Sequence, residues 1–320
     1  MEKFSQFRDR ASGIAPFLPV VTPTSRISLL FYVILFAIRL PILVTACFVY
    51  FGILQWLPIG NLGKKMSLWT LLGIPGIWWV DIQIENLPRG SLGVHRETRL
   101  PKAGTIIACS FTCPIDALYL AAIFNPIFTA SYPSTSKVQP ISLLQAILRA
   151  FSPPEVSPRG CDKKNLVDLA TLLKRHPNRC IVVFPECTTT NGKGILELSP
   201  SLCSARIGAK IFPVSLRYDS ANITTPIPGT YLQFIWGLLS KPTHYVRVKI
   251  AESIIVAANN VLLPQQTSKP EADLLLDNDQ MVLLRSVGEA MARSGRVKRV
   301  GLGVEEKQEF VRMWTKNHTR

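Results

Sequence analysis

A long apolar run near the start of the chain limits the folds that are open to it. Residues 27–59 read ISLLFYVILFAIRLPILVTACFVYFGILQWLPI, and Arg39 and Pro41 interrupt the run near its middle. A helix needs about 20 apolar residues to cross a bilayer, so the run is long enough for one crossing or for two short helices. Because proline disrupts the interior of a helix, we expect a bend at Arg39–Pro41.

Basic residues flank this run on both sides, four before it and two after it: Lys3, Arg8, Arg10, Arg26, Lys64 and Lys65. Positive charge on both flanks favours both ends on the cytosolic side, which predicts a membrane hairpin. A single span over 40–59 and a hairpin buried in a soluble core are the alternatives. A charge at the bilayer centre costs about 2.5 to 3.5 kcal/mol, so the hairpin must shield Arg39. Residues 66–80 contain three tryptophans and are predicted to lie along the membrane surface or to pack on the domain that follows.

Composition narrows the classes of partner. The chain has 320 residues, of which 48% are hydrophobic, and a formal net charge of +15. Such a charge favours anionic partners, and the hydrophobicity favours lipid over nucleic acid, for which no binding motif is present. The seven cysteines are scattered and include no C-x-x-C pair, which predicts reduced thiols on the cytosolic side and no zinc site. No signal peptide is predicted at the N-terminus.

Strands and helices are predicted to alternate from residue 81 onward. The predicted strands are 80–85, 104–110, 126–131, 179–186, 209–217 and 244–253, and the predicted helices are 116–124, 140–151 and 164–175. This order predicts one α/β domain with a mixed sheet flanked by helices. The four predicted parts are a cytosolic arm (1–26), a membrane anchor with an interfacial segment (27–80), the α/β domain (81–260) and a linker with a basic helical C-terminal region (261–320).

Two carboxylates follow buried strands in this domain. The segment ACSFTCPIDALY (108–119) places Asp116 at the start of a helix, and VVFPECTTTNGKGIL (182–196) places Glu186 at the end of a strand. Ligands gather at the carboxyl ends of strands in α/β sheets, and helix N-termini favour anions. The two segments therefore predict a site for a phosphate-bearing substrate.

Residues 105–217 resemble the PlsC-type glycerolipid acyltransferase family. SFTCPID matches its N-H-x-S-P-x-D motif at Thr112, Pro114 and Asp116, with Phe111 where the family has histidine. VFPECTTTNGKG matches its F-P-E-G-T block with Cys187 in place of glycine, and IFPVSL matches a later block. The two ends of the chain are similar to a narrower group, the fungal lysophosphatidic acid:oleoyl-CoA acyltransferases of lipid droplets and the endoplasmic reticulum.

The resemblance implies acyl transfer from acyl-CoA, as co-substrate, to the hydroxyl of lysophosphatidic acid or another lysophospholipid, without a cofactor or a metal. It implies a catalytic role for Asp116 and substrate binding by Glu186 and Thr188. Lys137 and Arg159 fall near the family's second, phosphate-binding motif. It also implies a protein of the endoplasmic reticulum membrane or of lipid droplets, with its domain facing the cytosol and with no nucleic-acid partner.

The base of the family's motif does not carry over, because Phe111 cannot accept a proton. A positioned general base contributes roughly 10²–10⁴-fold to a rate, so slow acyl transfer without it is physically possible. The substitutes considered are Asp116 acting through water, His95 reaching round from its loop, and Cys113 or Cys187 as nucleophile. The favoured hypothesis is an acyltransferase. The alternative is a non-catalytic lipid-binding or lipid-droplet scaffold protein of the same fold.

Overall fold

The computed structural model of the chain describes residues 2–20, 26–57, 60–85, 99–158, 165–219, 221–256 and 270–318. The strands are β1 (Trp79–Ile84), β2 (Ile106–Cys109), β3 (Ile127–Tyr132), β4 (Thr135–Ile141), β5 (Ile181–Val183), β6 (Gly194–Ile195), β7 (Lys210–Tyr218), β8 (Tyr245–Ile250), β9 (Ile254–Ile255) and β10 (Lys298–Arg299). The α-helices are α1 (Arg26–Phe48), α2 (Asn61–Gly73), α4 (Pro114–Phe124), α5 (Leu143–Arg149), α6 (Leu169–Arg175), α7 (Tyr231–Leu239), α8 (Pro270–Gly295) and α9 (Val304–His318). Short 3-10 or π helices are η1 (Glu2–Phe7), η2 (Val49–Leu54), η4 (Pro200–Ser204) and η5 (Ala221–Ile223).

The main sheet is mixed, as predicted. Its strand order is β1-β8-β7-β2-β5-β3-β4, with β9 paired to β7. The central strand β2 is parallel to both β5 and β7, whereas β4 runs antiparallel to β3 and β8 antiparallel to β7. Parallel strands end at the same edge of a sheet, so the segments that follow β2, β5 and β7 meet there.

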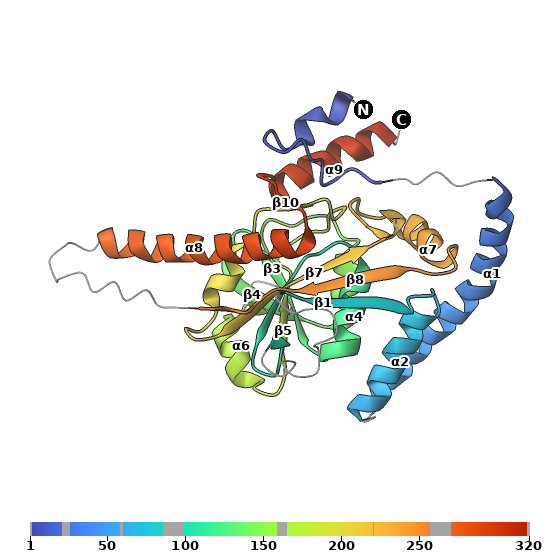
Figure 1. Cartoon of the computed structure of the whole chain (residues 1–320), viewed down its shortest axis with the longest axis horizontal. Helices are drawn as coiled ribbons and strands as arrows, with labels where there is room; N and C mark the ends of the chain where they lie inside the picture. The colour runs from blue at the N-terminus through green and yellow to red at the C-terminus, as the bar shows by residue number, and fades with distance from the viewer. Residues whose placement is uncertain are drawn as a thin grey trace.

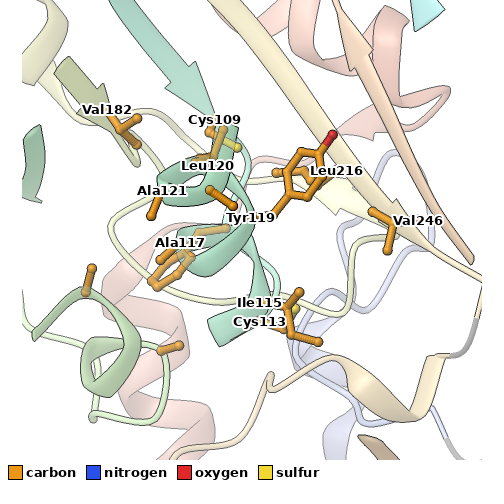
Figure 2. Close-up of a cluster of buried hydrophobic side chains, with 14 of the residues drawn as sticks. Cys109, Cys113, Ile115, Ala117, Tyr119, Leu120, Ala121, Val182, Leu216 and Val246 are labelled. Atoms are coloured by element: carbon orange, nitrogen blue, oxygen red, sulfur yellow. The ribbon is translucent and has the colours of Figure 1, made fainter. Parts of the chain in front are cut away.

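Helices cover both faces of the sheet (Figure 1). Alternate residues of the central strands divide between two apolar clusters: Ile107 and Val182 belong to the cluster with α2 and α4, and Ile106 and Ile181 to the cluster with α6 and α8. Figure 2 shows the first cluster, in which buried side chains of α4 such as Tyr119 lie beside strand residues of β7 and β8. The central strands are apolar on both sides because both of their faces are buried.

The apolar run forms one continuous helix. α1 passes through Arg39 and Pro41 without interruption and continues into η2, so the prediction of two helices with a hairpin turn at Arg39–Pro41 is wrong. Proline removes one backbone hydrogen bond, and the remaining bonds of this long helix keep it continuous. Thr45 also donates a hydrogen bond from Oγ1 to the carbonyl of Pro41 (2.8 Å), one turn earlier in the same helix. The chain reverses later, between η2 and α2.

Leu29–Leu54 is, within the described part of the chain, the helical stretch long and apolar enough to cross a membrane. Two contacts near its middle hold α1 against the domain. Phe36 packs on Trp236 of α7 with ring centroids 5.0 Å apart. The guanidinium of Arg39 donates to three carbonyls, those of Lys241 (2.7 Å), Pro242 (3.0 Å) and Pro75 (3.3 Å).

Other predicted elements differ in extent from those observed. Residues 140–141 belong to strand β4 rather than to a helix, and helix α5 begins only at Leu143. The helix predicted over 164–175 begins at Leu169, because Val167 instead forms an isolated bridge with Val138. The C-terminal region predicted to be helical contains α8 (Pro270–Gly295) and α9, whereas β6, β10 and α7 were not predicted.

The two ends of the chain pack on each other. Figure 1 shows η1 and α9 side by side, with the N- and C-termini together. Phe310 of α9 is fully buried against Phe4, Phe7 and Phe17, with ring centroids 5.3 to 5.8 Å apart. The side-chain amide of Asn191 donates to the carbonyls of Ala15 and Leu18 and joins the N-terminal arm to the loop after β5.

We predict that Phe310→Ala lowers the free energy of unfolding by about 3 to 5 kcal/mol, the usual cost of truncating a buried phenylalanine. Denaturant titration in mild detergent would measure it. Arg312→Ala, an exposed change on the same helix, should stay within about 0.5 kcal/mol of the wild type. Equal stability of Phe310→Ala and the wild type would contradict this packing.

Candidate functional site

Asp116 lies at the edge of the sheet where β2 ends, in the first turn of α4. Its carboxylate is fully buried and accepts hydrogen bonds from the backbone N–H of Thr112 (2.7 Å) and of Cys113 (3.0 Å). The hydroxyl of Thr112 (2.9 Å) and that of Tyr218 at the end of β7 (2.5 Å) also donate to it. Burial raises the pKa of Asp116, and these hydrogen bonds partly offset the rise. The carboxylate thus fixes the turn that leads from β2 into α4.

Phe111, at the motif position without a base, is part of the apolar core. Its ring is 2% exposed and stacks on Phe184 with centroids 4.4 Å apart. Both backbone polar groups of Phe111 form hydrogen bonds: its N–H donates to Glu186, and its carbonyl accepts from the N–H of Thr190 (3.0 Å). No acid–base group therefore occupies this position, and the stacked ring fills it.

Glu186 joins two loops at the same edge. One carboxylate oxygen accepts from the N–H of Phe111 and the other from the N–H of Leu196, each at 3.2 Å. The side chain is 1% exposed, and burial raises its pKa to about 8. Two backbone hydrogen bonds only partly replace the water that this carboxylate gives up, so the neutral form is favoured.

Lys307 of α9 enters the same region from the C-terminal part of the chain. Its ammonium is fully buried and donates to the hydroxyl of Thr188 (2.8 Å) and to the carbonyl (2.5 Å) and hydroxyl (3.1 Å) of Thr189. Burial lowers its pKa to about 7, and the negative charge of Glu186 acts in the opposite direction. The predicted site residue Thr188 is thereby tied to α9.

Cys187 has a backbone conformation that favours glycine. Its φ is +58°, in the left-handed region that L-residues other than glycine adopt at a cost. This geometry gives a physical reason for the glycine of the F-P-E-G-T block. Burial raises the pKa of the Cys187 thiol to about 11 and that of Cys113 well above its usual value. Both thiols are protonated at neutral pH, which argues against either as nucleophile.

A polar cavity of about 210 Å³ opens beside Cys187 and Thr188. Its cation is Arg149 at the end of α5, whose guanidinium donates to the hydroxyl of Tyr132 and the carbonyl of Ser131 and lies 4.0 Å from the carboxylate of Glu155, which also lines the cavity. Lys137 is exposed on β4 and is not among the residues that line the cavity. Arg159 lies outside the described residues.

An apolar cavity of about 260 Å³ lies on the other side of α5. It is bounded by η2 and α2 on one side and by α4 and α7 on the other, and Pro114 and Ile115 line it beside the turn that Asp116 holds. Ile147 of α5 lines this apolar cavity, whereas Arg149 lines the polar one. One short helix therefore separates a charged cavity from an apolar one.

Sequence reasoning missed Tyr218, Lys307 and Arg149. Tyr218 ends a strand parallel to β2, so the strand-end argument that selected Glu186 applied to it as well. Lys307 stands between Val304 and Phe310 on the apolar face of α9, and a charge on such a face is a signal of a buried partner.

Two other histidines that could serve as a base have different surroundings. His176 caps the end of α6 and is exposed, and His244 is buried with Nε2 2.7 Å from the carbonyl of Leu238. His95 lies outside the described residues. Within the described ranges, no three His, Cys, Asp or Glu side chains gather as a metal site would require.

Comparison with known proteins reveals two fungal relatives. The chain is 25% identical over 324 residues to the Schizosaccharomyces pombe protein named "Putative lysophosphatidic acid:oleoyl-CoA acyltransferase", covering 99% of this chain and 100% of that protein. It is 23% identical to "Lysophosphatidic acid:oleoyl-CoA acyltransferase 1" of Saccharomyces cerevisiae, covering 81% of this chain and 86% of that one. The chain is a relative of these fungal proteins. The resemblance predicted from the ends of the sequence is thus confirmed.

No family model matches the chain. Among solved structures, it is similar to the 1-acyl-sn-glycerophosphate acyltransferase PlsC of Thermotoga maritima, with a TM-score of 0.39 and 17% identity, covering 82% of this chain and 95% of that one. At this TM-score the likeness supports no conclusion about the site.

The raised pKa of Glu186 predicts how stability depends on pH. The folded chain keeps a proton on Glu186 up to pH about 8, whereas the unfolded chain releases it near 4.5, so the free energy of unfolding falls as pH rises between these values. The lowered pKa of Lys307 makes the free energy of unfolding rise with pH, but only between pH about 7 and 10.5. Below pH 7 the effect of Glu186 can therefore be measured without that of Lys307. Glu186→Gln should flatten the fall measured by denaturant titration from pH about 5 to 7. Glu197→Gln, an exposed change beyond β6, should retain it, and equal slopes in the wild type and Glu186→Gln would contradict the assignment.

Proposed function

We propose that the chain is a membrane-bound acyltransferase that transfers a fatty acyl group from acyl-CoA to lysophosphatidic acid. The observation that carries this proposal is the similarity along 99% of the chain to a protein whose name gives that acceptor and that donor. The motif residues Asp116, Glu186 and Thr188 lie at one edge of the sheet; Thr188 lines the polar cavity, and Pro114 and Ile115, next to Asp116 in the chain, line the apolar one. The family's product, phosphatidic acid, would serve phospholipid and triacylglycerol synthesis.

The two cavities suit the two halves of a lysophospholipid. Arg149 is the cation of the polar cavity, and a guanidinium matches a phosphate with paired hydrogen bonds. The apolar cavity lies directly against α1 and α2, so an acyl chain could enter it from the apolar side of these helices. We assign the phosphate to the polar cavity and the acyl chain to the apolar one, with Arg149 in the role that was expected of Lys137 or Arg159.

The transfer itself needs no cofactor. The acceptor hydroxyl oxygen attacks the thioester carbonyl carbon, the carbon–sulfur bond breaks, and coenzyme A leaves as a thiolate that takes up the hydroxyl proton. Phe111 offers no base, so the reaction lacks a contribution of roughly 10²–10⁴-fold. Asp116 has no exposed surface and accepts four hydrogen bonds from nitrogen and oxygen donors, so we assign it a positioning role: it holds the turn at 111–113.

Attachment to the membrane is proposed through α1 and η2. Large apolar side chains of α1 are exposed, for example Leu30 at 73% and Phe48 at 71%. Arg39 ties the middle of α1 to carbonyls of the domain, so a crossing centred on Arg39 would draw the domain into hydrocarbon. We therefore propose that the helix lies along one leaflet, with both of its ends and the domain on the same side.

We place this surface on the endoplasmic reticulum or on lipid droplets, facing the cytosol, where the six described cysteines, all free, would remain reduced. Fractionation and protease protection of tagged chain in cells test this proposal. Recovery in the soluble fraction, or protection of the domain from external protease, would contradict it.

A second candidate is a lipid-binding protein without turnover. The stacked Phe111 and the complete burial of Asp116 favour it, because neither group is available to a substrate proton in this arrangement. It shares the fold, the cavities and the membrane surface with the acyltransferase, and it differs in predicting saturable binding of lysophosphatidic acid and no product.

An acylation assay separates the two candidates. Purified chain in liposomes receives lysophosphatidic acid and labelled oleoyl-CoA, and we expect slow formation of phosphatidic acid by the wild type. Arg149→Ala should raise the KM for lysophosphatidic acid by roughly tenfold or more, because removing a charged hydrogen bond costs about 1.5 to 3 kcal/mol. Asp116→Asn should lower kcat, since it disturbs the turn at 111–113. Lys137→Ala is the matched control and should match the wild type.

Product formation that Arg149→Ala leaves unchanged would overturn the assignment of the polar cavity. Saturable lysophosphatidic acid binding without product in the wild type would favour the second candidate. Gain of turnover in Phe111→His would then show that the missing base alone separates the chain from activity.

A further inference from the structure

A third cavity lies at the opposite end of the sheet from the motif residues. It has a volume of about 280 Å³ and forms where η2 and the start of α2 meet the connection from α4 to β3. That connection precedes β3, which is parallel to β5, so the cavity lies at the amino ends of strands whose carboxyl ends carry the motif. It lies away from the motif residues and has a different set of charged groups from the polar cavity, although Ile141 lines both.

Three cations line this cavity: Lys64 and Lys65 of α2, and Arg179, which precedes β5. None of the described residues that line it is acidic, and within the described ranges none of the three cations forms an ion pair. Arg179 is fixed in place by hydrogen bonds to the side chain of Asn125 (3.1 Å) and to the carbonyls of Asn125 and Pro126 (3.1 and 3.0 Å). The cavity therefore collects positive charge without an anion from the described chain to balance it.

The surroundings of the cavity are apolar and exposed. Tyr50 and Leu68 form part of its wall, and Tyr50 belongs to the stretch that is long and apolar enough to enter a membrane. Close by in the chain, Trp56, Leu62 and Met66 are 84%, 79% and 72% exposed. Exposed tryptophan beside lysines is typical of a membrane–water interface, where basic side chains attract anionic headgroups. A soluble anion would not account for these apolar neighbours.

We propose that this cavity binds the headgroup of a membrane phospholipid that carries a phosphate monoester. A phosphate monoester has a charge near −2 and three acceptor oxygens, which three cations match better than they match a singly charged phosphodiester. The apolar rim meets the acyl chains of the same lipid. This inference uses the proposed membrane attachment but not acyl transfer. The bound lipid would hold the η2–α2 end of the molecule at the membrane surface.

Vesicle flotation of the full chain tests the site. One set of vesicles contains phosphatidylcholine with phosphatidic acid, a second contains phosphatidylcholine with phosphatidylglycerol at matched surface charge, and a third contains phosphatidylcholine alone. We expect the wild type to prefer the phosphatidic acid set, and the double variant Lys64→Gln with Lys65→Gln to lose that preference. The loss should be roughly thirtyfold in affinity, since each of the two basic residues contributes about 1 kcal/mol near such a surface.

Matched variants make the outcome specific. Lys174→Gln with Lys316→Gln removes the same charge from α6 and α9, away from the cavity, and should retain the preference, as should Lys64→Arg with Lys65→Arg. If phosphatidic acid were bound at the acyl-transfer cavities instead, none of the three double variants would change the preference for it. Equal binding to the two anionic sets, or equal loss in the control pair, would overturn the headgroup site. Binding of inorganic phosphate to the lipid-free chain as tight as binding to the phosphatidic acid vesicles would overturn its assignment to lipid. Weak binding to all three sets would instead count against the membrane attachment, whether or not acyl transfer is detected.

Discussion

The buried carboxylate of Glu186 is the interaction on which the geometry of the site depends. It accepts one backbone hydrogen bond from Phe111, directly after β2, and one from Leu196, directly after β6. A buried carboxylate without partners would be costly, so each of these N–H groups is needed where it is. The carboxylate therefore sets the distance between the two motif segments. Asp116 does the same within one segment, since three of its hydrogen bonds come from Thr112 and Cys113.

The two ends of the chain also hold the loop that follows β5. Lys307 of α9 holds Thr188 and Thr189 from one side, and Asn191 is held by carbonyls of the N-terminal arm. The aromatic contacts of Phe310 keep the arm and α9 together. A buried lysine is stable only while it keeps its acceptors, so detachment of α9 would release the threonine loop as well. The site is therefore a property of the whole chain and not of its central domain alone.

Sequence patterns anticipated the mixed sheet because its central strands are buried on both faces and read as apolar runs. They anticipated Asp116 and Glu186 as neighbours because parallel strands end at one edge. They failed where one residue is compatible with two kinds of secondary structure. Pro140 can begin a helix or end an edge strand, and here it lies in β4. Pro41 was read as a break, although one missing hydrogen bond leaves a long helix intact. Lys307 lies 119 residues from Thr188, a distance over which local patterns carry no information.

Phenylalanine at position 111 affects the packing and the hydrogen bonding around it, and does not only remove a base. It stacks on Phe184, which is itself nearly parallel to Phe128 with ring centroids 6.5 Å apart, so the position is part of a cluster of three rings in the core. The carboxylate of Asp116 meanwhile accepts from the hydroxyl of Tyr218, so its hydrogen bonding is already satisfied. A histidine at position 111 would give up part of the stacking, worth about 0.5 to 1.5 kcal/mol, and would compete with Tyr218 for Asp116. The pocket is thus adapted to its phenylalanine. If acyl transfer occurs, it depends on the orientation of the two substrates and on the reactivity of the thioester, because general-base catalysis at this position is absent.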